Sequence, residues 1–210
     1  MKAGARGIPG TGALEAGQGA MAVTTARRLD GYTLDDWESL EPVEGHRVEL
    51  VDGRFVVNAA PSAKHQRVAD RLCRLLDDAV APEGMEALTA TGVRVREGLA
   101  YISDVVVSTE RVETTTVGVD TVALVAEVVS PSTKKTDRLE KPAAFASAGV
   151  PAYWRVELDE ADGPTVYCYQ LHDGVYSEVA VLNPGEAGQV AVTGAVSVTF
   201  DPKDLHQRRK

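Results

Sequence analysis

Residues Val122–Val129 form an almost unbroken apolar run, and Glu127 is the only charged residue in it. A strand of this composition is covered on both faces, so the run predicts a central strand of a sheet with other layers packed above and below it. Tyr101–Val107 is a second apolar strand, and it contains Asp104, which the two-residue alternation of a strand places on the same face as Val106. We therefore expect two carboxylates inside strands that otherwise belong to the core.

The rest of the chain predicts a mixture of helices and strands. Apolar residues at helical spacing predict one helix from Ser62 to about Val80 and a second from Asp137 to Ala148. Thr33 is placed to cap a short helix, and Asp52-Gly53 predicts a tight hairpin turn. Further strands are expected at His46–Val51, Arg54–Asn58, Glu86–Ala90, Val93–Arg96, Ala152–Leu158, Thr165–Leu171 and Val175–Val181, with a linker at Glu110–Asp120 and a final hairpin within Val190–Phe200. Because helices and strands alternate in the middle of the chain and strands dominate its end, the fold class is α/β, with a mixed β-sheet flanked by α-helices.

A chain of 210 residues suits one domain. The N-terminal segment is rich in glycine and alanine without periodicity, so residues 1–25 are expected to be a disordered leader, which translation from Met21 would largely remove. We expect residues 26–203 to form the single domain and residues 204–210 to form a basic tail.

Charge and cysteine content narrow the class of protein. The net charge of −9 opposes a protein that coats nucleic acid with a broad basic face, but it leaves room for an enzyme that uses a local patch and a metal. No apolar segment approaches the ~18–20 residues that a membrane span needs. The two cysteines lie far apart, and the four histidines show no zinc-binding spacing. We therefore expect a cytoplasmic protein with no membrane partner.

Burying an unpaired carboxylate costs several kcal/mol, so Asp104 and Glu127 each need a cation, a metal or a raised pKa. Carboxylates on adjacent strands suit a hard cation such as Mg²⁺ or Mn²⁺, and we favour a metal site. The alternatives are acids at strand ends that face solvent, or ion pairs with buried arginines such as Arg94 or Arg155. If the two acids lie together, replacing either one is expected to leave the metal-free fold intact or more stable, because their repulsion is relieved.

Two further residues have more than one interpretation. Glu49 alternates against Val48 and Leu50, which favours a position facing solvent or paired with Arg47. His65 lies on the apolar stripe of the first long helix, where it is either a histidine at the edge of the core or a group near the metal.

A basic segment follows Glu127 in a chain that is acidic as a whole, and it contains Lys134, Lys135, Arg138 and Lys141. Local positive charge beside a metal site with two carboxylates is what a phosphodiester substrate requires. Asp137 and Glu140 also have the spacing of a capping box, which explains these two acids but not the lysines.

Several motifs occur together and in a fixed order. They are Glu-Leu-Val-Asp-Gly (49–53), His65, Asp104, Glu-Val-Val-Ser-Pro-Ser-Thr (127–133), Asp137 with Lys141, and Gly-Val-Pro-Ala-Tyr-Trp (149–154). From about Tyr32 to Leu171 the chain resembles the Uma-two family of restriction-endonuclease-like proteins, within the PD-(D/E)xK nuclease superfamily.

This resemblance implies a restriction-endonuclease-like core and Mg²⁺-dependent (or Mn²⁺-dependent) hydrolysis of phosphodiester bonds. It assigns Asp104 and Glu127 to metal binding and Glu49 to a supporting acid that binds metal or orients water. It points to Lys141 as the catalytic lysine, with Lys134 and Lys135 as fallback candidates. We expect substrate contacts from Lys134, Lys135, Arg138 and His65.

The chain departs from the superfamily pattern at two positions. Ser103 replaces the proline of the PD element, and Val129 replaces the lysine expected two residues after Glu127. Lys141 is the substitute, but Pro142 follows it, and residues before proline avoid the helical region, which would place Lys141 at the edge of the helix.

Two hypotheses of different classes follow. The first is a metal-dependent endonuclease that acts on nucleic acid, with DNA as the expected substrate and a homodimer as the expected assembly. The second is a binding or regulatory module that keeps the nuclease fold without its activity, which the net charge and Val129 favour. A common point reached by Asp104, Glu127 and a lysine would favour the nuclease.

Overall fold

The computed structural model describes residues 30–131, 133–158 and 163–206, so the expected leader lies outside the described residues. In chain order, the elements are α1 (Leu34–Glu38), β1 (His46–Val51), β2 (Arg54–Ala59), α2 (Ala63–Val80), η1 (Ala81–Glu83), β3 (Glu86–Arg96), β4 (Leu99–Ser108), β5 (Thr116–Gly118), η2 (Val119–Thr121), β6 (Val122–Val129), η3 (Thr136–Glu140), α3 (Lys141–Ser147), β7 (Ala152–Leu158), β8 (Pro164–His172), β9 (Val175–Leu182), β10 (Gly188–Ala191), β11 (Ser197–Phe200) and α4 (Lys203–His206).

Nine strands of the described chain form one mixed sheet, in which β2, β1, β4, β6, β7, β8 and β9 follow one another and β3 joins β4 to β5. The β6–β7 and β3–β5 pairs are parallel, and the other pairs are antiparallel. Strands β10 and β11 form a separate hairpin. The predicted α/β class with a mixed sheet and flanking helices is confirmed.

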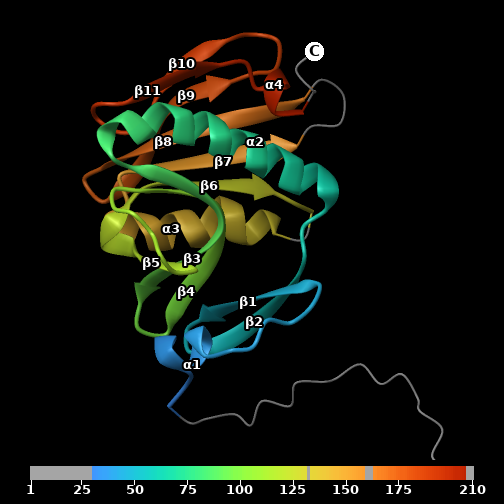
Figure 1. Ribbon diagram of the computed structural model, residues 1–210, viewed down its shortest axis with the longest axis vertical. Coiled ribbons are helices and arrows are strands. Elements are labelled where there is room, and N and C mark those ends of the chain that lie inside the picture. The colour runs from blue at the N-terminus through green and yellow to red at the C-terminus, as the bar shows by residue number, and fades with distance from the viewer. Residues whose placement is uncertain (1–29, 132, 159–162, 207–210) are drawn as a thin grey trace, which may run out of the picture.

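Successive residues of β6 pack into two cores on opposite faces of the sheet, as the alternation of a strand requires. Leu124 and Ala126 belong to the core beneath α2, whereas Val125 packs with Phe145 of α3. Figure 1 shows α2 crossing the upper strands of the sheet near β10, β11 and α4, with the β1–β2 hairpin at the opposite end. All eight residues of β6 are buried, which confirms the predicted central strand.

The first predicted long helix is confirmed as α2, which begins where the Ser62 hydroxyl accepts a hydrogen bond from the His65 amide. The second is present, but its first turn is a wide turn, η3, in which the Lys141 amide donates to the Thr136 carbonyl. Pro142 then lies in the first turn of α3, where its missing N–H is no loss. Lys141 is the first residue of α3, at the edge of this helix as expected, but it keeps helical backbone angles (φ −61°, ψ −50°) and its side chain is buried.

Other differences from the predicted elements are local. The two strands expected at Glu86–Ala90 and Val93–Arg96 are one strand, β3, interrupted by the positive φ of Ala90 (51°). The expected linker contains β5 and the start of η2. Residues 204–206 of the expected tail form the end of α4, with Leu205 buried, and residues 207–210 lie outside the described residues. No described helix is long and apolar enough to cross a membrane.

Strand β4 changes neighbours along one of its edges. Strand β3 pairs along the other edge for the whole length of β4, so β1 and β6 must share the remaining one. Strand β1 pairs there at Ala100 and β6 pairs from Val105 onward. The sheet therefore forks at Ile102–Asp104, where backbone groups on this edge have no pairing strand within the described chain.

Candidate active site

The fork brings together side chains from four elements: Glu49 from β1, Asp104 from β4, Glu127 from β6 and Lys141 from the start of α3. Some of these side chains form hydrogen bonds with the backbone groups of β4 that the fork leaves without a pairing strand. The Ile102 amide donates to Glu49 Oε1 at 3.0 Å, and the Asp104 amide donates to Glu127 Oε2 at 3.4 Å. Lys141 Nζ donates to the Ile102 carbonyl at 3.4 Å. Because buried backbone groups must be paired, the fork itself fixes these ionisable side chains in place.

Lys141 lies at the centre of the acids. Its Nζ is 2.9 Å from Glu127 Oε1, 3.4 Å from Glu49 Oε1 and 3.7 Å from Asp137 Oδ1. The wide turn η3 points both Asp137 and Lys141 inward, and the Tyr153 hydroxyl donates to the Asp137 carbonyl at 2.7 Å, which anchors the turn. The structure therefore brings Lys141 within 4 Å of Glu49, Glu127 and Asp137, and Asp104 adjoins this group through its amide contact with Glu127.

Asp104 is the most fully bonded of the acids. Its Oδ1 accepts from Arg47 at 2.8 Å, and its Oδ2 accepts from the Val128 amide at 2.9 Å and lies 3.1 Å from His65 Nε2. Burial alone would raise the pKa of Asp104, but the hydrogen bond and charge of His65, then the charge of Lys141 and the hydrogen bond from Arg47, lower it to about 2. Asp104 is therefore held as an anion.

The pKa of Glu127 is shifted in the opposite direction. Burial raises the pKa of Glu127 well above its usual range, and the charges of Asp104 and Asp137 add to this effect against the opposing charge of Lys141. Burial would lower the pKa of Lys141, yet Glu127, Glu49 and Asp137 hold it well above its usual value. The two shifts therefore have different main causes, which are burial for Glu127 and the neighbouring carboxylates for Lys141.

The donor set fits a divalent cation of the kind that carboxylates bind. Four buried acids, Glu49, Asp104, Glu127 and Asp137, face two permanent cations, Arg47 and Lys141, which leaves two negative charges when all are ionised. A hard divalent ion with oxygen ligands would balance that charge. As the side chains stand, ammonium and guanidinium groups fill the space between the carboxylates, and the described residues contain no ready-made group of three metal ligands.

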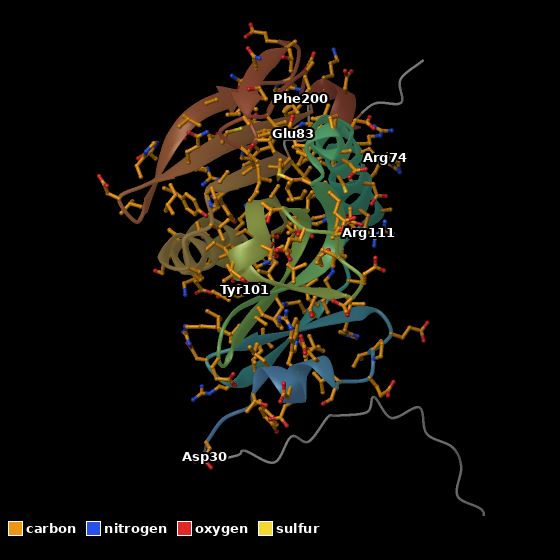
Figure 2. All side chains as sticks on the ribbon, turned by 60° about the vertical axis from the view of Figure 1, so that its left-hand side comes forward. Asp30, Arg74, Glu83, Tyr101, Arg111 and Phe200 are labelled. Atoms are coloured by element: carbon orange, nitrogen blue, oxygen red, sulfur yellow. The ribbon has the colours of Figure 1, made fainter. Side chains whose placement is uncertain are left out.

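A cleft of about 540 Å³ opens onto this cluster, and its lining includes all four acids, Arg47, Lys141, His65 and Asn58. The Tyr101 ring also lines it, with its centre 5.5 Å from Lys141 Nζ. Figure 2 shows Tyr101 in the middle of the molecule, between the β1–β2 hairpin and the upper strands of the sheet. A ligand can therefore approach the buried acids from one side.

Three of the predicted substrate contacts lie elsewhere. Lys135 is exposed and pairs with Glu140 at 2.6 Å, and Arg138 forms a two-pronged pair with Glu157 at 2.8 and 2.9 Å. Lys134 is also exposed, and none of the three basic residues lines the cleft. His65, in contrast, both lines the cleft and contacts Asp104.

Several expectations about single residues are wrong. Glu49 is buried rather than solvent-facing, because Lys141 and the Asn58 amide, which donates to its Oε2 at 2.9 Å, cover it. Asp137 caps no helix by its side chain but turns into the acid cluster. The arginines proposed as ion-pair partners lie elsewhere, with Arg94 on Glu38 and Arg155 on Glu157.

Sequence reasoning missed Arg47 as the partner of Asp104, and it missed Asn58 and Tyr153 as supports of the cluster. One signal was available for Arg47, because Arg47 and Glu49 are two residues apart and therefore share a face of β1. Once Glu49 is placed in the site, Arg47 is expected beside it. Nothing in the local sequence marks Tyr153 or Asn58.

Comparisons with known proteins agree with this architecture. The model of the Uma2 family, described as "Putative restriction endonuclease", matches residues 34–200. A crystal structure of a putative nuclease belonging to DUF820 from Anabaena variabilis matches with a TM-score of 0.63 at 18% identity, over 83% of this chain and 97% of that one. No curated protein gives a significant match. The structural match supports the fold, and the acid cluster lies within the matched family segment.

Proposed function

The chain belongs to the Uma2 family of "putative restriction endonucleases", and from this premise we propose that it is a metal-dependent endonuclease that hydrolyses phosphodiester bonds, with DNA as its substrate. The observation that carries the proposal is the position of Lys141, whose ammonium lies within 4 Å of three buried carboxylates at the floor of an open cleft. Buried ionisable groups gathered in a cleft are typical of functional sites, and hydrolysis of a phosphodiester has a role for both the acids and the lysine.

Asp104 and Glu127 are the acids proposed to hold Mg²⁺ or Mn²⁺. When bound there, the ion would make a water more acidic and offset the negative charge that builds on the phosphate. His65 and the Val128 amide fix one oxygen of Asp104, so this carboxylate is oriented before any ligand arrives. The pKa of Glu127 is raised whereas that of Asp104 is lowered, so neighbouring groups stabilise the negative charge of Glu127 less than that of Asp104. A cation bound at Glu127 would supply this missing stabilisation.

Lys141 is proposed to stabilise the negative charge that develops on a phosphate oxygen, since its ammonium faces the same cleft as both acids. Glu49 lies 3.4 Å from Lys141 Nζ and is proposed to orient the attacking water or to bind a second ion. The exposed residues Lys134, Lys135 and Arg138 remain candidates for contacts with phosphates outside the cleft.

A binding module with a degraded active site is the second hypothesis, and its supports are the acidic net charge and Val129 in the position of the expected lysine. The Lys141 ammonium, 2.9 Å from Glu127, supports the nuclease over this alternative. We further propose a cytoplasmic homodimer, because cutting two strands with one site per chain favours pairing. The mass of the native protein in solution tests this assembly.

The test is cleavage of plasmid DNA, single-stranded DNA and RNA with Mg²⁺, Mn²⁺ or EDTA, using the wild-type protein beside Glu127→Gln and Lys141→Met. Glu83→Gln, which changes an exposed acid at the end of η1, is the matched control. Cleavage that requires metal, disappears in both site variants and persists in the control is the expected result. If the wild-type protein and Glu127→Gln are equally inert on every substrate, the binding-module hypothesis replaces the nuclease.

A further inference from the structure

Both carboxylate oxygens of Asp104 already have partners. Arg47 occupies Oδ1 at 2.8 Å, while His65 and the Val128 amide occupy Oδ2 at 3.1 and 2.9 Å. A cation that joins Asp104 must therefore displace one of these partners or share an oxygen with it. The partner that leaves determines how the site changes when a cation binds.

Arg47 is the partner that a cation would most easily displace. The Val128 amide belongs to the backbone of a buried strand, and the His65 side chain on α2 is 7% exposed, whereas the Arg47 side chain is 24% exposed. Arg47 also lines both the cleft and a neighbouring cavity of about 280 Å³, so it has space on two sides. A divalent cation on Asp104 would also repel the Arg47 guanidinium, which favours its displacement.

The cleft offers a displaced guanidinium one chemical role. Among the described residues that line it, the permanent cations are Arg47 and Lys141. Lys141 is 6% exposed and enclosed by carboxylates, so its position is largely fixed. Arg47 is the accessible cation, and its planar fork matches the oxygens of a phosphate in a way that an ammonium does not.

We propose that Arg47 is the phosphate-binding group of this site, held on Asp104 until a divalent cation takes its place. The guanidinium then binds the phosphodiester at the mouth of the cleft, so metal binding makes the phosphate site available. This inference rests on the proposed function, because it assumes that Asp104 receives a metal.

The experiment measures two ligands by calorimetry on the full chain. Mn²⁺ is titrated into wild-type protein, Arg47→Met, Arg47→Lys and Arg54→Met, where Arg54 is an exposed arginine of the adjacent strand β2. Inorganic phosphate is then titrated into each protein in Mg²⁺ buffer. Removing Arg47 is expected to strengthen Mn²⁺ binding by about tenfold or more, and to weaken phosphate binding by a similar factor, since the charged hydrogen bonds of a guanidinium are lost.

Opposite signs for the two ligands distinguish this role from a structural one, which would weaken both. Arg47→Lys keeps a positive charge without the fork, so it is expected to change phosphate binding more than Mn²⁺ binding, and it carries the test if Arg47→Met does not fold. Equal Mn²⁺ affinity in the wild-type protein and both Arg47 variants overturns the inference while leaving the proposed function intact. Absence of Mn²⁺ binding in every protein overturns both.

Discussion

The two central acids should respond in opposite ways to removal of their charge in metal-free buffer. We compare Asp104→Asn with Glu127→Gln, which keep the size of each side chain. The lowered pKa of Asp104, from 3.8 to about 2, corresponds to about 2 kcal/mol of stability at neutral pH. That contribution is present above the unfolded pKa and is lost as the pH falls toward 2. Asp104→Asn should therefore lower the free energy of unfolding by this amount.

Glu127→Gln should have no such cost. Burial raises the pKa of Glu127, so its stabilising effect is present below the unfolded pKa of 4.5 and is lost as the pH rises through the folded value. At neutral pH the charged form opposes folding, and glutamine removes this penalty while its carbonyl oxygen still accepts from Lys141. We expect unchanged or increased stability at pH 7.5 and no increase near pH 4.

The assay is urea and thermal unfolding in EDTA at pH 7.5 and pH 4, with Glu83→Gln as an exposed control. For a chain of this length, a loss of about 2 kcal/mol in Asp104→Asn lowers the melting temperature by roughly 4–8 °C. A loss of 2 kcal/mol or more in Glu127→Gln at pH 7.5 would refute the reasoning, because it would show Glu127 to be a stabilising anion in an ion pair with Lys141. The sequence alone predicted the same change in stability for both acids, whereas the hydrogen bonds to Asp104 predict a loss of stability for Asp104→Asn only.

Three other outcomes can be measured on the same proteins. Mn²⁺ at a hundred times its dissociation constant should stabilise the wild-type protein by about 2.7 kcal/mol and leave the stability of Glu127→Gln nearly unchanged. Thermal unfolding measures both, and equal stabilisation of the two proteins would show that the ion binds elsewhere. Lys141→Met should abolish cleavage and cost roughly 3–5 kcal/mol in urea unfolding, because it leaves three buried carboxylates without their shared cation; a fully stable variant would contradict this charge balance. Gly53→Ala should be more destabilising than Gly45→Ala in the same assay, since both have positive φ but a Cβ at Gly53 would lie 3.2 Å from the Gly31 Cα, and equal losses would show that φ alone matters.

The sequence identified the acids that stand in apolar strands, because Asp104 and Glu127 violate a pattern that is otherwise regular. It could not place Glu49 in the same way. Alternation along β1 tells which face a residue occupies but not what covers that face, and the cover here is Lys141, which is 92 residues away in the chain. Only the resemblance to a family placed Glu49 in the site before the structure was known.

Charged residues near the site in sequence were harder to assign. Arg138 was expected to contact substrate because it follows the acids, yet the position of Glu157 on β7 draws it out of the cleft. Lys141 was expected at a helix edge because Pro142 follows it, and it does begin α3, but the wide turn η3 before it keeps its backbone helical and its side chain buried. Local sequence preferences predict which backbone conformations are unfavourable, whereas contacts between distant elements decide whether the folded protein adopts them.

The fork in the sheet explains why structure and chemistry coincide at this point. Where β1 and β6 part, the backbone of Ile102 and Asp104 needs new partners, and it finds them in Glu49, Glu127 and Lys141. These side chains are therefore oriented by the fold itself and not by a ligand. The same geometry concentrates more negative than positive charge in a buried place, so the fold that positions the acids also leaves them receptive to a cation. It follows that adding a divalent ion should stabilise the sheet most at the fork, and that slower amide hydrogen exchange at Ile102 and Asp104 with Mn²⁺ than with EDTA would show it.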